Sequence, residues 1–327
     1  MNLVRAIRFA SVMVAAISSV HAHAQAKSGD DYPQQPVRLI VGYAAGGAND
    51  VVARIVGQKL SERLGQPVIV ENKTGAGGMI GAEYVSKAKP DGHTLLFAAS
   101  SMFTTNPVMY KKVPYAASNF APISMVVNFP FFVLVGAQHP VTTVQELREY
   151  WKAKPEIANC SGAAGVHQLG FALFKSKTGN TGELISYRGT NEAISAVIAG
   201  TVLMTIADGA PVASAISGGR VRALAVTATK RLAAYPNIPT IAEAGLPDME
   251  MQSWFGLLAP AGTPAAVVKR LQQEVHQLVN TKEFEQQVST LNVIPQDNTP
   301  DQFASMIASD LARWRAVAKA GGIEPGN

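Results

Sequence analysis

The feature that most constrains the fold is a strand, a glycine-rich loop and a helix in immediate succession. Residues 37–41 (VRLIV) are an apolar run without helical periodicity, which predicts a short buried strand. Residues 42–48 are mostly glycine and alanine. Apolar side chains then recur at helical spacing over 52–64, and Gly65 predicts the helix end. Another apolar run follows at 68–70, so this unit predicts two parallel strands joined by a right-handed crossover.

The same alternation continues along the chain. We predict strands at 94–98, 131–135, 183–187, 202–206 and 221–227, and helices at 143–151, 166–177, 191–199, 264–280, 282–291 and 300–320. A strand, a small-residue loop and a helix recur at 157–177, as a loose echo of 37–64. Alternating strands and helices followed by a helical tail indicate an α/β protein.

Composition excludes several classes of protein. The 327 residues suffice for two domains, and 47% hydrophobic residues with 16% charged residues argue against disorder. The single cysteine, Cys160, allows no internal disulfide and no CxxC site. The net charge of +5 is mild and comes without a Lys/Arg block, so we expect no nucleic-acid partner.

Motifs for cofactors, metals and nucleophiles are missing from the sequence. The glycines at 75–81 fail the GxGxxG register because Ile80 stands at the third glycine position, so a tight turn is the better interpretation. There is no HExxH motif and no G-x-S-x-G motif. We therefore expect no cofactor, no metal and no catalytic residue.

The first residues have the pattern of a secretory signal peptide. Arg5 and Arg8 precede an apolar run at 9–20, and Ala24-Gln25-Ala26 forms an A-x-A cleavage site. The alternative is a buried first helix. We predict a signal peptide at 1–26, cleaved near Ala26, and an exported protein that is not inserted in the membrane. Cys160 lies too far from this site to carry a lipid anchor.

Four short loops share one physical theme: small residues follow a strand end. They are 43–50, Ser100-Ser101, 161–166 and Asp208-Gly209. Glycine allows backbone N–H groups to approach a ligand, and a helix N-terminus adds partial positive charge. Ligands of open α/β sheets bind beyond the carboxyl ends of the strands. Each loop by itself is also compatible with an ordinary turn.

These loops contain no lysine or arginine, and Arg188 is the only nearby cation in the sequence. An anionic ligand would then be held by amides, hydroxyls and water, which favours capture and release over bond-making. Asn49 or Asp50 is predicted to cap the helix that follows the first loop, and Asp50 is better explained as a cap than as a ligand group. His167 could either point into a cleft or cap its helix. A nucleophilic Cys160–His167 pair is an alternative, but a buried thiol explains Cys160 better.

Short motifs occur in a fixed order along the chain. They are Tyr32-Pro33 with Pro36-Val37, GGxxD at 46–50, LGQPVIVEN at 64–72, GAGG at 75–78, PDGHTLL at 90–96, YRG at 187–189, RALAVT at 222–227, PTIAEAG at 239–245 and WFGLLAPAGTP at 254–264. In this ordered set the chain resembles the Bug family of extracytoplasmic solute receptors. These receptors are the substrate-binding proteins of tripartite tricarboxylate transporters.

The resemblance implies a type II periplasmic-binding-protein fold, with two α/β domains joined by two crossing strands and a ligand cleft between them. We expect domain 1 at 31–132 and 252–327, and domain 2 at 133–251. The family implies hinge-like closure on a small carboxylate: a dicarboxylate, a tricarboxylate, an acidic amino acid or an aromatic acid. Tyr43-Ala44-Ala45 and Tyr187-Arg188-Gly189 depart from the family's frequent residues, so the ligand stays open.

Carried over by position, the resemblance implies a binding site made by two loops and cleft-lining residues. The expected ligand-binding residues are Tyr43, Ala45, Gly46, Gly47, Asn49, Ser100, Ser101, Ser161, Gly162, Ala164, Gly165, His167 and Asp208. Phe103, Phe129, Phe131 and Phe132 could add aromatic surface there, although Phe131 and Phe132 fit core positions better.

We thus expect a monomeric periplasmic receptor that delivers its ligand to membrane transporter subunits. A sensor that presents its closed form to a signalling partner is the alternative, and an enzyme is a third possibility.

Overall fold

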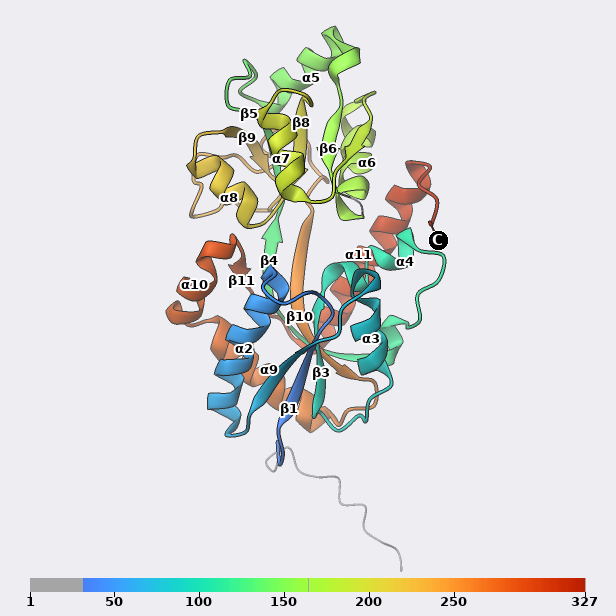
Figure 1. The fold of residues 1–327 in the computed structure, drawn as a ribbon, viewed down its shortest axis with the longest axis vertical. Helices are drawn as coiled ribbons and strands as arrows, with labels where there is room; N and C mark the ends of the chain where they lie inside the picture. The colour runs from blue at the N-terminus through green and yellow to red at the C-terminus, as the bar shows by residue number, and fades with distance from the viewer. Residues whose placement is uncertain (1–31, 164, 327) are drawn as a thin grey trace, which may run out of the picture. The chain divides into compact units, whose positions relative to one another are not determined.

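Two mixed β-sheets organise the computed structural model, which describes residues 32–163 and 165–326 (Figure 1). The signal peptide expected at 1–26 and the predicted site residue Ala164 lie outside these residues. From Pro33 onward the chain forms one compact unit. We call the part built around the six-stranded sheet lobe A, and the part built around the five-stranded sheet lobe B.

The sheet of lobe A has the strand order β11-β4-β10-β3-β1-β2. Its strands are β1 (Val37–Val41), β2 (Val68–Asn72), β3 (Thr94–Ala99), β4 (Phe120–Pro130), β10 (Gln252–Pro260) and β11 (Ile294–Pro295). β1 pairs in parallel with β2 and β3, which confirms the predicted crossover unit. β10 is antiparallel to both β3 and β4, so the sheet is mixed.

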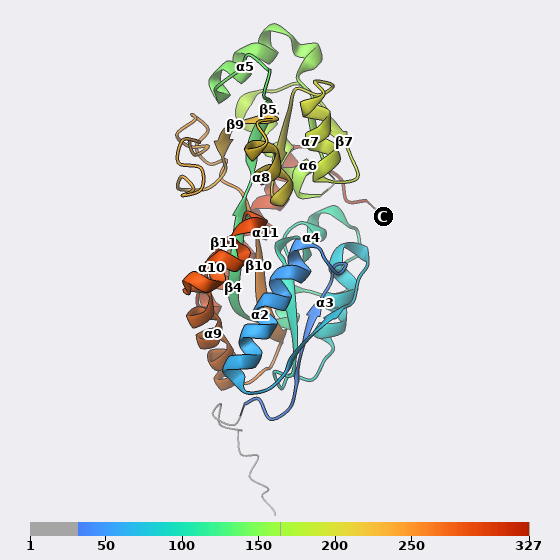
Figure 2. The ribbon, with the colours of Figure 1, turned by 60° about the vertical axis from the view of Figure 1, so that its left-hand side comes forward.

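Helices cover both faces of this sheet. They are α2 (Ala48–Leu64), α3 (Met79–Ser86), α9 (Ala265–Val279), α10 (Lys282–Val288) and α11 (Pro300–Ala320). The short helix α4 (Asn106–Met109) contacts α11, and its Val108 belongs to the core cluster of lobe B. α3 and the first half of α11 pack on one face, where Ile40, Leu96 and Trp254 share a core with Phe303 and Ile307. α2 and α9 contact each other on the other face (Figures 1 and 2).

The sheet of lobe B has the order β7-β6-β8-β5-β9. Its strands are β5 (Phe132–Gly136), β6 (Cys160–Gly162), β7 (Leu184–Ser186), β8 (Met204–Ala207) and β9 (Val221–Val226), and its helices are α5 (Val144–Ala153), α6 (Val166–Thr178), α7 (Thr190–Ile198) and α8 (Ala210–Ser217). α5 and α6 border one core with Phe131 and Val133, and α7 and α8 border the other with Phe132 and Leu134. Phe131 and Phe132 are therefore core residues, as is Phe103 in lobe A.

Two strands carry the chain between the lobes, and β4 and β10 run side by side toward lobe B in Figure 1. Phe131 alone separates β4 from β5. The buried Thr227 fixes both crossings: its Oγ1 accepts from Phe131 N at 2.7 Å and lies 2.5 Å from Met251 O, just before β10. One threonine hydroxyl thus joins the outgoing and returning chain.

A third connection runs along α11. Its first half belongs to the core of lobe A, whereas Trp314 and Ala318 belong to the core cluster of lobe B. Arg313 Nη2 also donates to Asp248 O at 3.2 Å. α11 therefore serves both cores, although the sequence places it in the expected domain 1. The expected domain boundaries stay a prediction. No helix in the described ranges is long and apolar enough to cross a bilayer.

Candidate functional site

A cavity of about 520 Å³ lies between the lobes. Lobe A supplies Tyr43, Gly77, Ser101, Thr105 and Asn106, lobe B supplies Ala163, Gly165, Val166, His167 and Gln168, and Met109, Tyr110, Glu324 and Gly326 complete the lining. Four residues expected from the sequence therefore line one cavity: Tyr43, Ser101, Gly165 and His167. They come from the loop after β1, the residues after β3 and the start of α6.

The lobe A wall is a small hydrogen-bonded network. Tyr43 Oη lies 2.8 Å from Ser101 Oγ and donates to Gly77 O at 3.1 Å. Asn106 Nδ2 donates to the same Gly77 carbonyl at 2.9 Å. Burial raises the pKa of the Tyr43 phenol, which stays neutral at neutral pH. When its single proton goes to Gly77, Ser101 donates to Tyr43, so the hydroxyls of this wall are held in fixed positions.

Asp50 anchors the loop after β1 through hydrogen bonds to its carboxylate. Its carboxylate is 3% exposed and accepts from Gly46 N at 2.9 Å, Arg54 Nε at 2.9 Å and Asn72 Nδ2 at 2.8 Å. Burial alone would raise the pKa of Asp50, but these hydrogen bonds outweigh it and lower the pKa. The prediction that Asn49 or Asp50 caps α2 is wrong, because Gly47 is the N-cap. Asp50 accepts the loop amide of Gly46 instead, and thereby anchors the loop.

The lobe B wall is the N-terminus of α6. The N–H groups of Val166, His167 and Gln168 precede the first helical hydrogen bond, which Leu169 N donates to Gly165 O at 3.1 Å. A helix N-terminus of this kind carries partial positive charge. Gly165 has φ 75°, and a Cβ there would lie 3.4 Å from Thr105 Cγ2 of the opposite lobe. The two walls therefore approach closely at Gly165.

His167 lines the cavity from the first turn of α6 and is 8% exposed. Its Nε2 is 3.5 Å from Asp208 Oδ1, and its ring meets Phe131 edge-on with centroids 5.8 Å apart. Both ring nitrogens are buried. The sequence left open whether this ring points into a cleft or caps its helix, and the structure places the ring beside Asp208.

The other expected site residues do not line this cavity. Ala45, Gly46 and Gly47 belong to the exposed part of the first loop, whereas Asn49, Ser100, Ser161 and Gly162 are buried. Asp208 lies 3.5 Å from His167 Nε2 but is not among the lining residues. Ser161 points into lobe B, where its Oγ donates to Ala193 O at 2.8 Å. Arg188 is exposed and is not among the cavity residues.

Sequence reasoning missed several lining residues. Thr105, Asn106 and Tyr110 belong to α4 and its flanks, a short helix with no amphipathic signal. Glu324 and Gly326 reach the cavity only because the chain turns back after α11. Gln168 could have been found, since it follows His167 in the first turn of a predicted helix.

Cys160 has the properties of a core thiol. It is 1% exposed, and burial raises its pKa to about 12. A thiol with this pKa is a poor nucleophile at neutral pH, so the Cys160–His167 pair is not supported. Within the described residues, no cluster of three or more His, Cys, Asp or Glu side chains is arranged to hold a metal.

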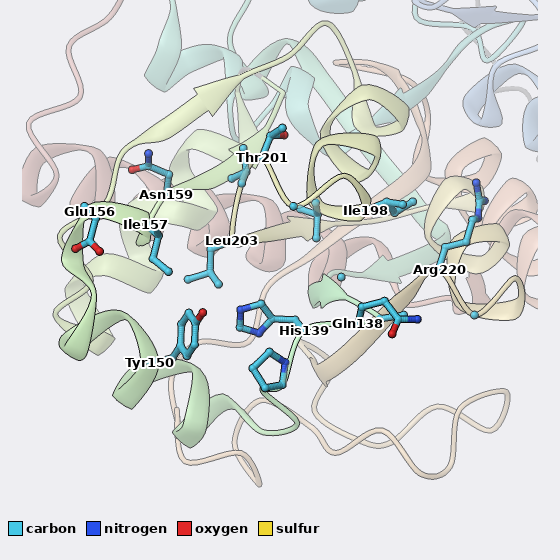
Figure 3. Close-up of a pocket in the computed structure, with 17 residues that line it drawn as sticks. Gln138, His139, Tyr150, Glu156, Ile157, Asn159, Ile198, Thr201, Leu203 and Arg220 are labelled. Carbon is cyan, nitrogen blue, oxygen red and sulfur yellow. The ribbon is translucent and has the colours of Figure 1, made fainter.

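A second cavity, of about 600 Å³, lies within lobe B (Figure 3). His139 and Tyr150 meet edge to face there at 4.6 Å, and burial, Arg222 and Lys154 lower the pKa of His139. No expected site residue lines this cavity. Lobe B alone supplies its lining, whereas both lobes line the cavity described above.

Comparison with known proteins gives the family. Residues 52–323 match the family model described as "Tripartite tricarboxylate transporter family receptor". Protein BugT of Bordetella pertussis is 31% identical over 324 residues, covering 98% of each chain.

Solved structures give the same answer. The structure of R. palustris Rpa4515 with adipate shares 31% identity, covers 90% of this chain and 100% of that chain, and has a TM-score of 0.77. The structure of MatC (Rpa3494) from Rhodopseudomonas palustris with bound malate shares 27% identity with this chain and has a TM-score of 0.71. The match covers 88% of this chain and 99% of that chain. The expected periplasmic-binding-protein fold is confirmed. The chain therefore belongs to the Bug family of tripartite tricarboxylate transporter receptors.

Proposed function

We propose that the protein is a periplasmic receptor that captures a small organic carboxylate in the cavity between its lobes and delivers it to a tripartite transporter. The observation that carries this proposal is the N-terminus of α6 on the cavity wall, with N–H groups that no helical carbonyl satisfies. Such groups bind carboxylates well. Relatives solved with adipate and malate support the same ligand class.

The cavity chemistry favours binding without bond-making. Its described lining contains no lysine and no arginine, so a carboxylate would meet amide and hydroxyl donors, directly or through water. A ligand held by such neutral donors leaves without breaking an ion pair. Reversible capture is what a transport receptor needs, and no step in this proposal is catalytic.

We further propose that the ligand bridges the two walls. Ser101 and Tyr43 act from lobe A, and Gly165 with the first turn of α6 acts from lobe B. The exposed loop at 44–48, which lies beside Tyr43, joins the site when the lobes close. The ligand then stabilises the closed state by contacting both lobes at once.

Binding can be tested by thermal shift and calorimetry with adipate, malate, succinate and citrate. Each acid is compared with an uncharged amide of the same length, such as adipamide. A ligand at about 100 times its dissociation constant should add roughly 2.7 kcal/mol of stability. Stabilisation by amides but by none of the acids would contradict the carboxylate proposal.

Delivery is tested separately in cells that carry the cognate transporter subunits. We expect uptake of the bound acid to require the receptor and to be lost with a Gly165 variant that no longer binds. Normal uptake in cells that lack the receptor would refute the transport role and leave the binding role intact.

A further inference from the structure

One carboxylate stands on the wall of the cavity. Among the described residues that line it, Glu324 is the only acidic side chain, and no lysine or arginine accompanies it. Glu324 is exposed, so its charge faces solvent-filled space. The site proposed above for an anion therefore also has an acidic side chain on its wall.

The backbone on both sides of Glu324 is held in place. We call residues 321–326, which follow α11, the strap. Before Glu324, Ile323 N donates to Ala318 O at 2.9 Å, and the Ile323 side chain packs against the lobe B core. After it, Gly326 N donates to Met109 O at 2.8 Å. Hydrogen bonds on either side thus hold the backbone of Glu324 at this edge of the cavity.

The strap also joins the other lining elements. Lys111 N donates to Gly326 O at 3.1 Å, and Tyr110 pairs with Gly326 in a parallel bridge. A Cβ at Gly321 would lie 3.1 Å from Ala172 Cβ of α6. The end of the chain accordingly lies beside α4 and α6 in Figures 1 and 2. The strap is therefore a wall of the cavity and not a loose tail.

The partial positive charge of the α6 N-terminus and the negative charge of Glu324 have different effects on the two ends of a ligand. The α6 N-terminus attracts a carboxylate. Glu324 repels a second carboxylate and attracts a cation. Asp208 does not act in the same way, because it lies 3.5 Å from His167 Nε2 and does not line the cavity.

We infer that Glu324 is a selectivity residue, which favours a zwitterionic acid with a distal ammonium group over a dicarboxylate of the same length. This inference rests on the carboxylate-binding function proposed above and narrows its ligand class. Because Glu324 is exposed, its effect is screened, and we expect it to change relative affinity by about threefold to tenfold.

The test uses length-matched pairs of acids: succinate with 3-aminopropanoate, glutarate with 4-aminobutyrate, and adipate with 5-aminopentanoate. Calorimetry at neutral pH and low salt gives the affinity ratio of each pair for the wild-type protein and for Glu324→Gln. The control is Glu62→Gln, which removes one negative charge from α2 at a side chain that is 55% exposed.

We expect the wild-type protein to prefer the amino acid of at least one pair. Glu324→Gln should move that ratio toward the dicarboxylate by about threefold to tenfold, and added salt should shrink the difference. Glu62→Gln should leave the ratio unchanged.

The contrary outcomes are distinct. If the dicarboxylates bind the wild-type protein at least as well as every amino acid, or if Glu324→Gln leaves the ratios unchanged, the selectivity inference is overturned while the carboxylate function stands. An equal effect of Glu62→Gln overturns it as well, because net charge alone would then account for the change. If no carboxylate of any kind binds, the proposed function itself fails.

Discussion

Phe303 and Trp314 lie on one helix, α11, and pack into the cores of different lobes. Both side chains are at most 4% exposed. The lobe closure proposed above would therefore require the packing of α11 against lobe B to adjust. The helix is a candidate determinant of the balance between open and closed states.

Truncating Trp314 should destabilise the whole protein. Trp314→Ala empties part of the lobe B core, and we expect a loss of about 3–5 kcal/mol in the free energy of unfolding, measured by urea denaturation. The control is Arg315→Ala, at the exposed next residue of the same helix. That variant should stay within about 0.5 kcal/mol of wild type. An equally small effect of Trp314→Ala would show that α11 does not hold lobe B.

Gly165 and Gly179 offer a matched pair for testing the binding site. They flank α6 as N-cap and C-cap with φ of 75° and 72°, so alanine strains the backbone at both and should cost about 1 kcal/mol or more. Only at Gly165 would the new Cβ meet the opposite lobe, 3.4 Å from Thr105 Cγ2.

We therefore expect Gly165→Ala to lower carboxylate affinity and Gly179→Ala to leave it unchanged, as measured by calorimetry. Equal affinity losses in the two variants would point to a stability effect and remove Gly165 from the proposed site.

Asp50 should give the protein a pH-dependent share of its stability. Its folded-state pKa is lowered, so the contribution is present above the unfolded value and is lost as the pH falls through the folded value. At neutral pH, Asp50→Asn should cost about 1–3 kcal/mol. The difference from wild type should shrink as the pH falls below about 4.

Urea midpoints across this pH range measure the Asp50 effect. The control, Asp301→Asn, changes an exposed carboxylate in the first turn of α11 and should shift stability by no more than about 1 kcal/mol. A difference for Asp50→Asn that grows as the pH falls would contradict the assigned direction of its pKa.

The Cys160 thiol should be unreactive in the folded protein. Burial and a pKa of about 12 leave almost no accessible thiolate, so Ellman's reagent should react only after denaturation. The reaction is followed in buffer and in guanidinium chloride. Rapid modification of the native protein would reopen the possibility of a reactive cysteine.

The sequence predicted the strands and helices with a regular pattern and missed those without one. β1 was predicted with its observed bounds, because VRLIV is an unbroken apolar run. β4 and β10, the long crossing strands, gave no clear signal. β4 contains Pro122 and Pro130, and β10 contains Gly256, residues that weaken a strand pattern.

The candidate site was predictable only where residues follow strands directly. Tyr43 and Ser101 could be found because the parallel strands β1 and β3 end at the same edge of the lobe A sheet, and Gly165 because it follows β6 of the lobe B sheet in the same way. Ser161 was expected in the site, but its hydroxyl donates to Ala193 O inside lobe B, and the direction of a side chain in the three-residue strand β6 could not be read from the sequence. The position of Glu324 on the cavity wall depends on a turn of the chain after α11, and no periodic pattern in the sequence predicts that turn.

The position of α11 in the chain has a consequence for folding. This helix follows every other described helix and strand in chain order, yet it completes the cores of both lobes. Neither lobe can reach its final packing until residues 300–320 are available. Such late, non-local contacts slow folding and join the two lobes into a single cooperative unit. A receptor assembled in this way keeps both cores incomplete until synthesis has passed residue 320.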